Sequence, residues 1–141
     1  MSALNTQFIG RTLRSPLIAG SAAITKDLDL MRRAEDAGAG AVIMKGFSDI
    51  VPMRTSPAPR YHLIEHHMAD REAFTFYTYE QASQRDAEGY LEELARAVEA
   101  LTIPVIANVD CQSVESWVKH ITLFAQAHPA AFELNVSCPH G

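Results

Sequence analysis

The sequence has few cysteines, and this scarcity limits the kinds of protein that it can encode. Only Cys111 and Cys138 occur among the 141 residues, too few for a scaffold held together by disulfide bonds. There is also no run of about 18 apolar residues of the kind that spans a membrane. The first residues lack the basic and then apolar order of a signal peptide. These absences predict a cytoplasmic protein with no membrane partner.

A strong charge of one sign is missing too. Lys and Arg number 12 against 17 Asp and Glu, the net charge is −5, and the basic residues form no cluster. Nucleic-acid-binding surfaces need such a cluster, so nucleic acid is not an expected partner. The hydrophobic fraction of 48% and the charged fraction of 21% are typical of a globular domain. We therefore expect one domain over residues 1–141, long enough to bury a core.

Apolar runs and helical patterns alternate along the chain. The predicted strands are residues 16–19, 41–44, 104–109 and 131–136. They are nearly continuous apolar runs, as in parallel strands covered on both faces. The predicted helices are residues 26–37, 85–100 and 114–127. The third should bury a stripe made of Val114, Trp117, Val118, Ile121 and Phe124, whereas the second should expose a solvated face made of Glu88, Glu92, Glu93 and Glu99.

Two segments interrupt this alternation. Residues 4–14 are expected to form a small hairpin that turns at Gly10. Residues 46–84 are too long for a plain connection, and their aromatic content favours an ordered insertion packed over a ligand. Three histidines in this insertion, His62, His66 and His67, raise the question of a metal site. No matching cysteine or carboxylate pattern accompanies them, so a surface or loop role is favoured and no metal is expected.

Strand–helix alternation of this kind predicts an α/β fold with a parallel sheet. Four such strands are half of a (β/α)₈ TIM-type barrel, which needs about 250 residues. An open four-stranded parallel sheet would leave two exposed edges. The chain is therefore expected to be the first half of such a barrel, preceded by the N-terminal hairpin, or to pair with another copy of itself.

The most chemically informative segment is the last one, Asn135-Val-Ser-Cys-Pro-His-Gly141. It places an amide, a hydroxyl, a thiol and an imidazole directly after a predicted strand. The carboxyl ends of strands are where open α/β sheets and barrels position their chemistry. A thiol with a pKa near 8.5 can give or take a proton at neutral pH. Alternatively, Cys138 is a small buried apolar residue, and Cys111 is expected to pack at a strand-to-helix turn.

These segments together resemble the N-terminal half of the flavin-binding barrel of class 1 dihydroorotate dehydrogenases and dihydropyrimidine dehydrogenases. Residues 4–6 and 15–21 are similar to the opening hairpin and first strand of that family, and residues 35–45 resemble its second strand. Residues 133–141 resemble its fourth-strand signature, with His140-Gly141 closer to the dihydropyrimidine branch. The resemblance implies an FMN-dependent dehydrogenase that acts on a CH–CH bond.

The resemblance also implies where the flavin would bind. Ala19, Gly20 and Ser21 would lie against the FMN ring through backbone contacts, which suits small residues. Lys45, followed by Gly46, would lie beside the flavin and stabilise negative charge on the reduced ring. The alternative for Lys45 is a structural salt bridge at the end of a strand.

For the substrate, the resemblance implies that Asn135 and Ser137 bind a small ring molecule. Cys138 would exchange a proton at one carbon while flavin N5 exchanges hydride at its neighbour. Asn135 could instead be an ordinary strand-end cap. Relatives that act on pyrimidines have an asparagine in the region of the third strand, but residues 74–80 contain none. A dihydropyrimidine, dihydroorotate and an unidentified ring therefore all stay open.

The resemblance further implies partners. Dehydrogenases of this family need an electron donor or acceptor, and an iron–sulfur or nicotinamide-linked subunit is a candidate because the chain has no cysteine cluster of its own. A homo-oligomer is the expected assembly. The competing hypothesis is a non-catalytic, truncated half-barrel or fragment that requires a missing C-terminal half or a partner.

Overall fold

The computed structural model describes residues 4–55, 60–64, 73–77 and 82–136. Its centre is a parallel sheet formed by β3 (Ile18–Ala19), β4 (Ala41–Ile43), β8 (Val105–Asp110) and β9 (Ala131–Leu134). In space these strands follow one another in chain order, β3 beside β4, β4 beside β8 and β8 beside β9. All four predicted strands are therefore confirmed, with ends that differ by one or two residues.

The short strand β5 (Phe47–Ser48) continues β4 along the same edge of β8. The amides of Val42, Met44 and Asp49 all donate to carbonyls of β8 or of Pro104 before it. Between β4 and β5 the ladder is interrupted opposite Asn108. There the buried Tyr90 hydroxyl donates to the Asn108 carbonyl at 3.0 Å and accepts from its amide at 3.3 Å. A side chain from a helix thus replaces the missing strand partner.

Three helices cover the sheet, and α3 packs between the other two. They are α1 (Leu28–Asp36), α3 (Ala87–Ala100) and α4 (Val114–Phe124), and the 3-10 turns η1 (Ala23–Thr25) and η2 (Ala125–Ala127) adjoin α1 and α4. Each helix begins at a capping side chain, from Asp27, Asp86 or Ser113, that accepts a hydrogen bond from a first-turn amide. Right-handed crossovers between neighbouring parallel strands place such helices in one layer.

The main hydrophobic core lies between this helix layer and the sheet. Strand β8 contributes alternate residues to it, and Phe47, Tyr90 and Phe124 form a central aromatic group with ring centroids 4.7–5.7 Å apart. The other alternate residues of β8, which include Asn108 and Asp110, face the opposite side of the sheet. In a closed barrel that side would be the interior.

The predicted stripe of α4 is wrong in part. Trp117 and Phe124 pack toward the core together with His120, whereas Val114 and Val118 are 74% and 62% exposed. Helix α4 is therefore rotated about its axis relative to the prediction. The exposed valines lie on the last helix of the layer, where an additional helix of a larger barrel would pack.

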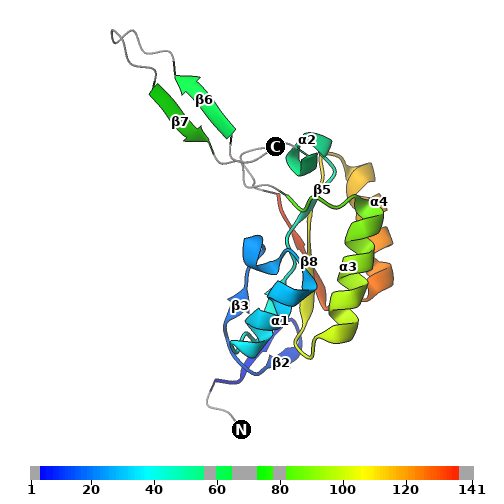
Figure 1. The fold of residues 1–141 in the computed structure, drawn as a ribbon. Coiled ribbons are helices and arrows are strands. Elements are labelled where there is room, and N and C mark those ends of the chain that lie inside the picture. Colours follow the sequence, from blue (N-terminus) through cyan, green and yellow to red (C-terminus); the bar gives the residue numbers. More distant parts are fainter. Residues whose placement is uncertain (1–3, 56–59, 65–72, 78–81, 137–141) are drawn as a thin grey trace.

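The N-terminal hairpin is confirmed as β1 (Thr6–Phe8) and β2 (Arg11–Leu13), with Ile9 and Gly10 in the turn. The insertion contains β5, α2 (Val51–Thr55) and an antiparallel ribbon formed by β6 (Arg60–Ile64) and β7 (Ala73–Tyr77). In Figure 1 this ribbon extends away from the α/β body. No helix among the described residues is long and apolar enough to cross a membrane.

Candidate active site at the carboxyl ends of the strands

Polar residues from successive strands meet at the carboxyl edge of the sheet. Ser21 follows β3, Lys45 and Gly46 follow β4, Asn108 lies near the end of β8, and Asn135 follows β9. Because the strands are parallel and adjacent, their carboxyl ends share one edge. The structure therefore places the predicted residues that follow β3, β4 and β9 at one edge of the sheet, together with Asn108 of β8.

The segment Lys45–Gly46 is held on several sides. The Lys45 amide donates to the Thr25 carbonyl at 3.0 Å, and the Gly46 amide donates to Ser21 Oγ at 2.9 Å. On its far side, the Gly46 carbonyl accepts from the Ser83 amide at 2.7 Å. These bonds fix the backbone that carries Lys45, whose side chain is half-buried.

Gly46 approaches the side chain of Asn108 closely. A Cβ at position 46 would lie 2.1 Å from Asn108 Oδ1 and 3.1 Å from its Cγ. Both distances are too short for an alanine unless the amide moves. The amide is itself held, because Nδ2 donates to the Glu133 carboxylate on the neighbouring strand, where the register pairs Asn108 with Glu133. The lack of a side chain at Gly46 is therefore needed for the Asn108 amide to keep this position.

Asn108 and Glu133 were not among the residues that the sequence singled out for this site. A signal was present, because Asn108 interrupts an otherwise apolar strand and is 5% exposed in the structure. A buried amide inside a strand needs hydrogen-bond partners, and here they come from the side of the sheet away from the helices. The hydrogen bond to Glu133 sets the orientation of the Asn108 side-chain amide beside Gly46.

The backbone around Gly20 borders open space. Ala19 packs on the main core, whereas an added Cβ at Gly20 would have no neighbour within 4 Å. The Gly20 carbonyl accepts from the Thr25 hydroxyl at 3.0 Å, which fixes the turn. A flat ring could therefore approach this backbone without a side chain in its way.

At the other edge of the sheet, Asn135 follows strand β9. Its amide donates to the Val109 carbonyl at 2.9 Å, and the residue is half-buried. Ser137, Cys138 and His140 lie outside the described residues.

A second polar group lies at the end of β5 and β8, beside the start of α4. Asp49 accepts from the Gln112 amide at 3.2 Å and from the Ser116 hydroxyl, and that hydroxyl is 3.2 Å from His120 Nδ1. Cys111 Sγ lies 3.7 Å from the same nitrogen. Burial raises the pKa of Cys111 to about 11, so it is a neutral thiol at pH 7 and a poor nucleophile. The prediction that Cys111 packs at a strand-to-helix turn is confirmed.

The nearby carboxyl of Asp110 is also affected by its surroundings. Burial raises its pKa, and the charge of Asp49 acts in the same direction, while a hydrogen bond from Ser48 opposes them. Among the described residues no group of three or more His, Cys, Asp or Glu side chains could hold a metal ion. His66 and His67 of the predicted histidine group fall outside that part of the chain.

The fold and this edge define an α/β protein whose four neighbouring parallel strands carry polar groups at their carboxyl ends. Over 132 residues, the chain is 32% identical to the catalytic subunit of dihydroorotate dehydrogenase B (NAD(+)) from Methanosarcina mazei. It is 26% identical over 137 residues to a putative dihydroorotate dehydrogenase A (fumarate) from Aeropyrum pernix, and 28% identical over 137 residues to the chloroplastic dihydropyrimidine dehydrogenase (NADP(+)) of Arabidopsis thaliana.

These similarities cover 93%, 97% and 94% of this chain but 39%, 42% and 32% of the three relatives. The chain thus matches one part of dihydroorotate and dihydropyrimidine dehydrogenases, and the resemblance inferred from the motifs is confirmed at that level. No protein-family model matches the chain. The parallel sheet and its helix layer agree with part of a barrel, and the described residues form no closed barrel.

Proposed function

We propose that this chain forms the N-terminal half of an FMN-dependent oxidoreductase that acts on the CH–CH bond of a dihydropyrimidine-like or dihydroorotate-like ring. The observation that carries this proposal is the carboxyl edge, where Ser21, Lys45–Gly46 and Asn135 directly follow β3, β4 and β9 of one parallel sheet. The similarity to dihydroorotate and dihydropyrimidine dehydrogenases over more than nine tenths of the chain supports it.

The residues at this edge suit a flavin. The open space beside Gly20 leaves room for a flat ring against the backbone, while the space beside Gly46 is taken by the Asn108 side chain. Ala19 and Ser21 extend that surface, and the Lys45 side chain would provide positive charge next to the ring. Bound FMN would supply hydride transfer, the chemistry that no amino-acid side chain performs.

The chain's own residues would bind the substrate and move the proton. Asn135 offers both a donor and an acceptor, which match the alternating NH and carbonyl groups of a pyrimidine ring. Ser137 would add a hydroxyl two residues further on. Cys138 would give a proton to one ring carbon when the ring is reduced, or take it when the ring is oxidised.

The substrate is proposed only as a class. The relatives' names point to dihydroorotate and to a dihydropyrimidine. The sequence of residues 74–80 lacks the asparagine expected for a pyrimidine site, which keeps another ring molecule open. We further propose a cytoplasmic protein that works as a homo-oligomer and exchanges electrons with an iron–sulfur or nicotinamide-linked subunit.

A second candidate is a non-catalytic half-barrel that needs a complementary half. The edge strands β3 and β9 have no further strand partner among the described residues. Large apolar residues are exposed near both edges, with Leu17 at 70% beside β3 and Val136 at 81% beyond β9. On helix α4, Val114 and Val118 are exposed as well. Exposed large apolar residues at both edges of the sheet are available for contact with another segment or chain.

Titration of the purified chain with FMN tests the cofactor proposal. We expect quenching of flavin fluorescence and a protein that keeps the yellow cofactor through gel filtration. If the chain takes up no FMN, either as a monomer or as an oligomer, the cofactor proposal is excluded for this chain and the non-catalytic half-barrel is the remaining candidate.

The substitution Cys138→Ser tests the role of the thiol. If FMN is retained, this variant should keep the cofactor and slow substrate turnover at neutral pH by about 100-fold or more. Unchanged turnover in that variant would contradict the role of Cys138.

A further inference from the structure

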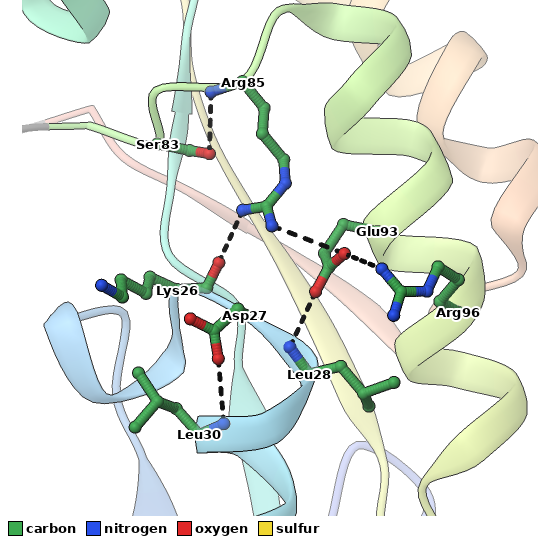
Figure 2. A network of polar contacts seen from close by, with 8 residues as sticks. All are labelled: Lys26, Asp27, Leu28, Leu30, Ser83, Arg85, Glu93 and Arg96. Carbon is green, nitrogen blue, oxygen red and sulfur yellow. Dashed lines mark hydrogen bonds and ion pairs between the residues drawn. The ribbon is translucent and has the colours of Figure 1, made fainter.

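Glu93 was expected on the solvated face of its helix, and this prediction is wrong. Its side chain is 5% exposed, and it lies under the loop that joins β3 to α1. One carboxylate oxygen accepts from the Leu28 amide at 2.7 Å. The other lies 3.4 Å from the Arg85 guanidinium and 2.8 Å from that of Arg96 (Figure 2). Carboxylates are rarely buried in proteins unless they are paired, so these partners indicate that Glu93 has a structural role.

One set of contacts runs from Glu93 to the loop before α1. Glu93 holds the Leu28 amide in the first turn of α1, and Arg85 Nη1 donates to the Lys26 carbonyl at 2.7 Å. This loop also contains Thr25, whose carbonyl accepts from the Lys45 amide. Figure 2 shows Arg85 and Glu93 reaching this segment from the side of α3. Glu93 therefore fixes the loop that holds Lys45.

A second set of contacts runs from Arg85 back to Gly46. The Arg85 amide lies 3.4 Å from the Ser83 hydroxyl, and the Ser83 amide donates to the Gly46 carbonyl at 2.7 Å. The first set of contacts starts from the Glu93 and Arg85 side chains, and the second starts from the main-chain amide of Arg85. Both end on the two-residue segment Lys45–Gly46, the first at the Lys45 amide and the second at the Gly46 carbonyl.

Arg85 and Arg96 differ in how much they restrain Glu93 and the segments around it. The Arg85 side chain is 33% exposed and bonds to a backbone carbonyl as well as to Glu93, whereas the Arg96 side chain is 64% exposed and bonds to Glu93. An exposed ion pair is screened by water and contributes little, while a half-buried one with two partners orients its neighbours. Arg85 is thus the arginine that connects Glu93 to the site.

We propose that Glu93 and Arg85 are positioning residues for the cofactor site, because the contacts that start from them hold the Lys45–Gly46 segment at the Lys45 amide and at the Gly46 carbonyl. Neither residue needs to touch the flavin. This inference rests on the proposed function for its meaning in catalysis, but the positioning itself can be measured without cofactor.

Amide hydrogen exchange of the full 141-residue chain tests the positioning. Three amides report on the site, those of Lys45, Gly46 and Ser83, and two sheet amides, those of Val42 and Ala130, serve as references. In Glu93→Ala we expect the three reporter amides to exchange on the order of tenfold faster relative to the references. Glu93→Gln keeps an acceptor for Leu28 and should give a smaller change. The exposed neighbour provides the control, Glu92→Ala, which should change nothing.

A uniform acceleration of reporter and reference amides would overturn the proposal, because it would mean that Glu93 only stabilises the whole fold. If Glu93→Ala does not fold, Arg85→Ala provides the same test, since Leu28 keeps its carboxylate partner in that variant. Arg96→Ala should leave the ratio of reporter to reference exchange unchanged. A change in that ratio as large as the one in Arg85→Ala would contradict the unequal roles.

FMN fluorescence titration then connects the positioning to the proposed function. In variants that remain folded, Glu93→Gln and Arg85→Ala should weaken FMN binding on the order of tenfold relative to Glu92→Ala. If the unmodified chain binds no FMN, the proposed function fails for this chain, and the exchange ratio still decides the positioning. If FMN binds equally well to all variants although the reporter amides exchange faster, the claim that the Lys45–Gly46 segment shapes the cofactor site is wrong.

Discussion

The two edges of the parallel sheet differ in what their polar groups do. At the carboxyl edge, side chains from successive strands contact one another and border open space at Gly20. At the amino edge, polar side chains form hydrogen bonds that connect neighbouring loops. Arg14 Nε donates to the Ala39 carbonyl at 3.0 Å, and Glu35 accepts from the Thr102 amide at 2.9 Å. The same strands thus carry the candidate site at their carboxyl ends and structural hydrogen bonds at their amino ends, which is the division of roles typical of barrel folds.

Two buried or half-buried glycines make this comparison concrete. Each lies against another segment so closely that a Cβ would clash, but the clashing atoms differ. At Gly40, on the amino edge, the Cβ would lie 1.9 Å from the Ser15 backbone carbonyl oxygen. At Gly46, on the carboxyl edge, it would meet a side-chain amide instead. A backbone cannot move without shifting a strand, whereas a side chain can rotate. The amino edge should therefore be the more sensitive to added volume.

The largest expected effect is that of Gly40→Ala. The Ser15 carbonyl is part of the segment leading into β3, so the added methyl group must displace that strand or the loop before β4. We expect a loss of about 3 kcal/mol in the free energy of unfolding, at the upper end for overpacking. Urea denaturation followed by circular dichroism measures it. Gly20→Ala is the matched control, because its Cβ would meet open space, and it should change stability by less than about 0.5 kcal/mol.

The next effect concerns the interruption between β4 and β5. Tyr90→Phe removes the hydroxyl that pairs with both backbone groups of Asn108 and leaves them buried without that partner. Burial raises the pKa of Tyr90, so the wild-type hydroxyl stays protonated and able to donate. We expect a loss of about 2 kcal/mol in unfolding free energy, typical for unsatisfied buried groups. Faster exchange of the Asn108 amide should accompany it, and an unchanged stability would mean that water replaces the hydroxyl.

Gly46→Ala should be milder for stability and more severe for binding. The Asn108 amide must turn away from the new methyl group and lose its bond to Glu133, at a cost of about 1 kcal/mol in unfolding free energy. FMN affinity, if the chain binds FMN, should fall by about tenfold or more because the ring's surface is altered. Asn108→Ala combined with Gly46→Ala should recover part of the lost stability, since the clash disappears. Strictly additive losses in this double variant would contradict the close contact.

The sequence predicted more of the fold than of the site. The strands were identified because buried parallel strands are nearly continuous apolar runs, a pattern that is local along the chain. Motifs predict Asn135 and Lys45 as site residues, and these two roles stay predictions. The roles of Asn108, Tyr90 and Glu93 depend on partners 18 to 65 residues away, and no local pattern encodes such contacts. Glu93 shows the limit well, because helical spacing alone assigned it to the solvent. Helix α4 failed for a related reason, since its orientation depends on which neighbours the layer provides.

The smallest expected effect concerns pH at the amino edge. Although partial burial acts to raise it, hydrogen bonds from the Thr102 hydroxyl and amide, together with the charge of Arg14, lower the pKa of Glu35 below its ordinary value of 4.5. A carboxyl whose pKa is lower in the folded state adds stability at pH values above the unfolded pKa, and loses it as the pH falls through the folded pKa. This contribution should therefore be complete at pH 7 and vanish in strong acid.

Thr102→Val isolates this contribution because it removes the hydroxyl and keeps the amide. Glu35 is only partly buried, so water weakens its interactions, and we expect a loss below about 1 kcal/mol at pH 7 that shrinks once the pH is lowered below about 4. Denaturant midpoints at pH 7 and pH 3 measure the difference, and Thr122→Val, at an exposed position of α4, is the control. A loss that is equal at both pH values would show that Thr102 acts by packing instead.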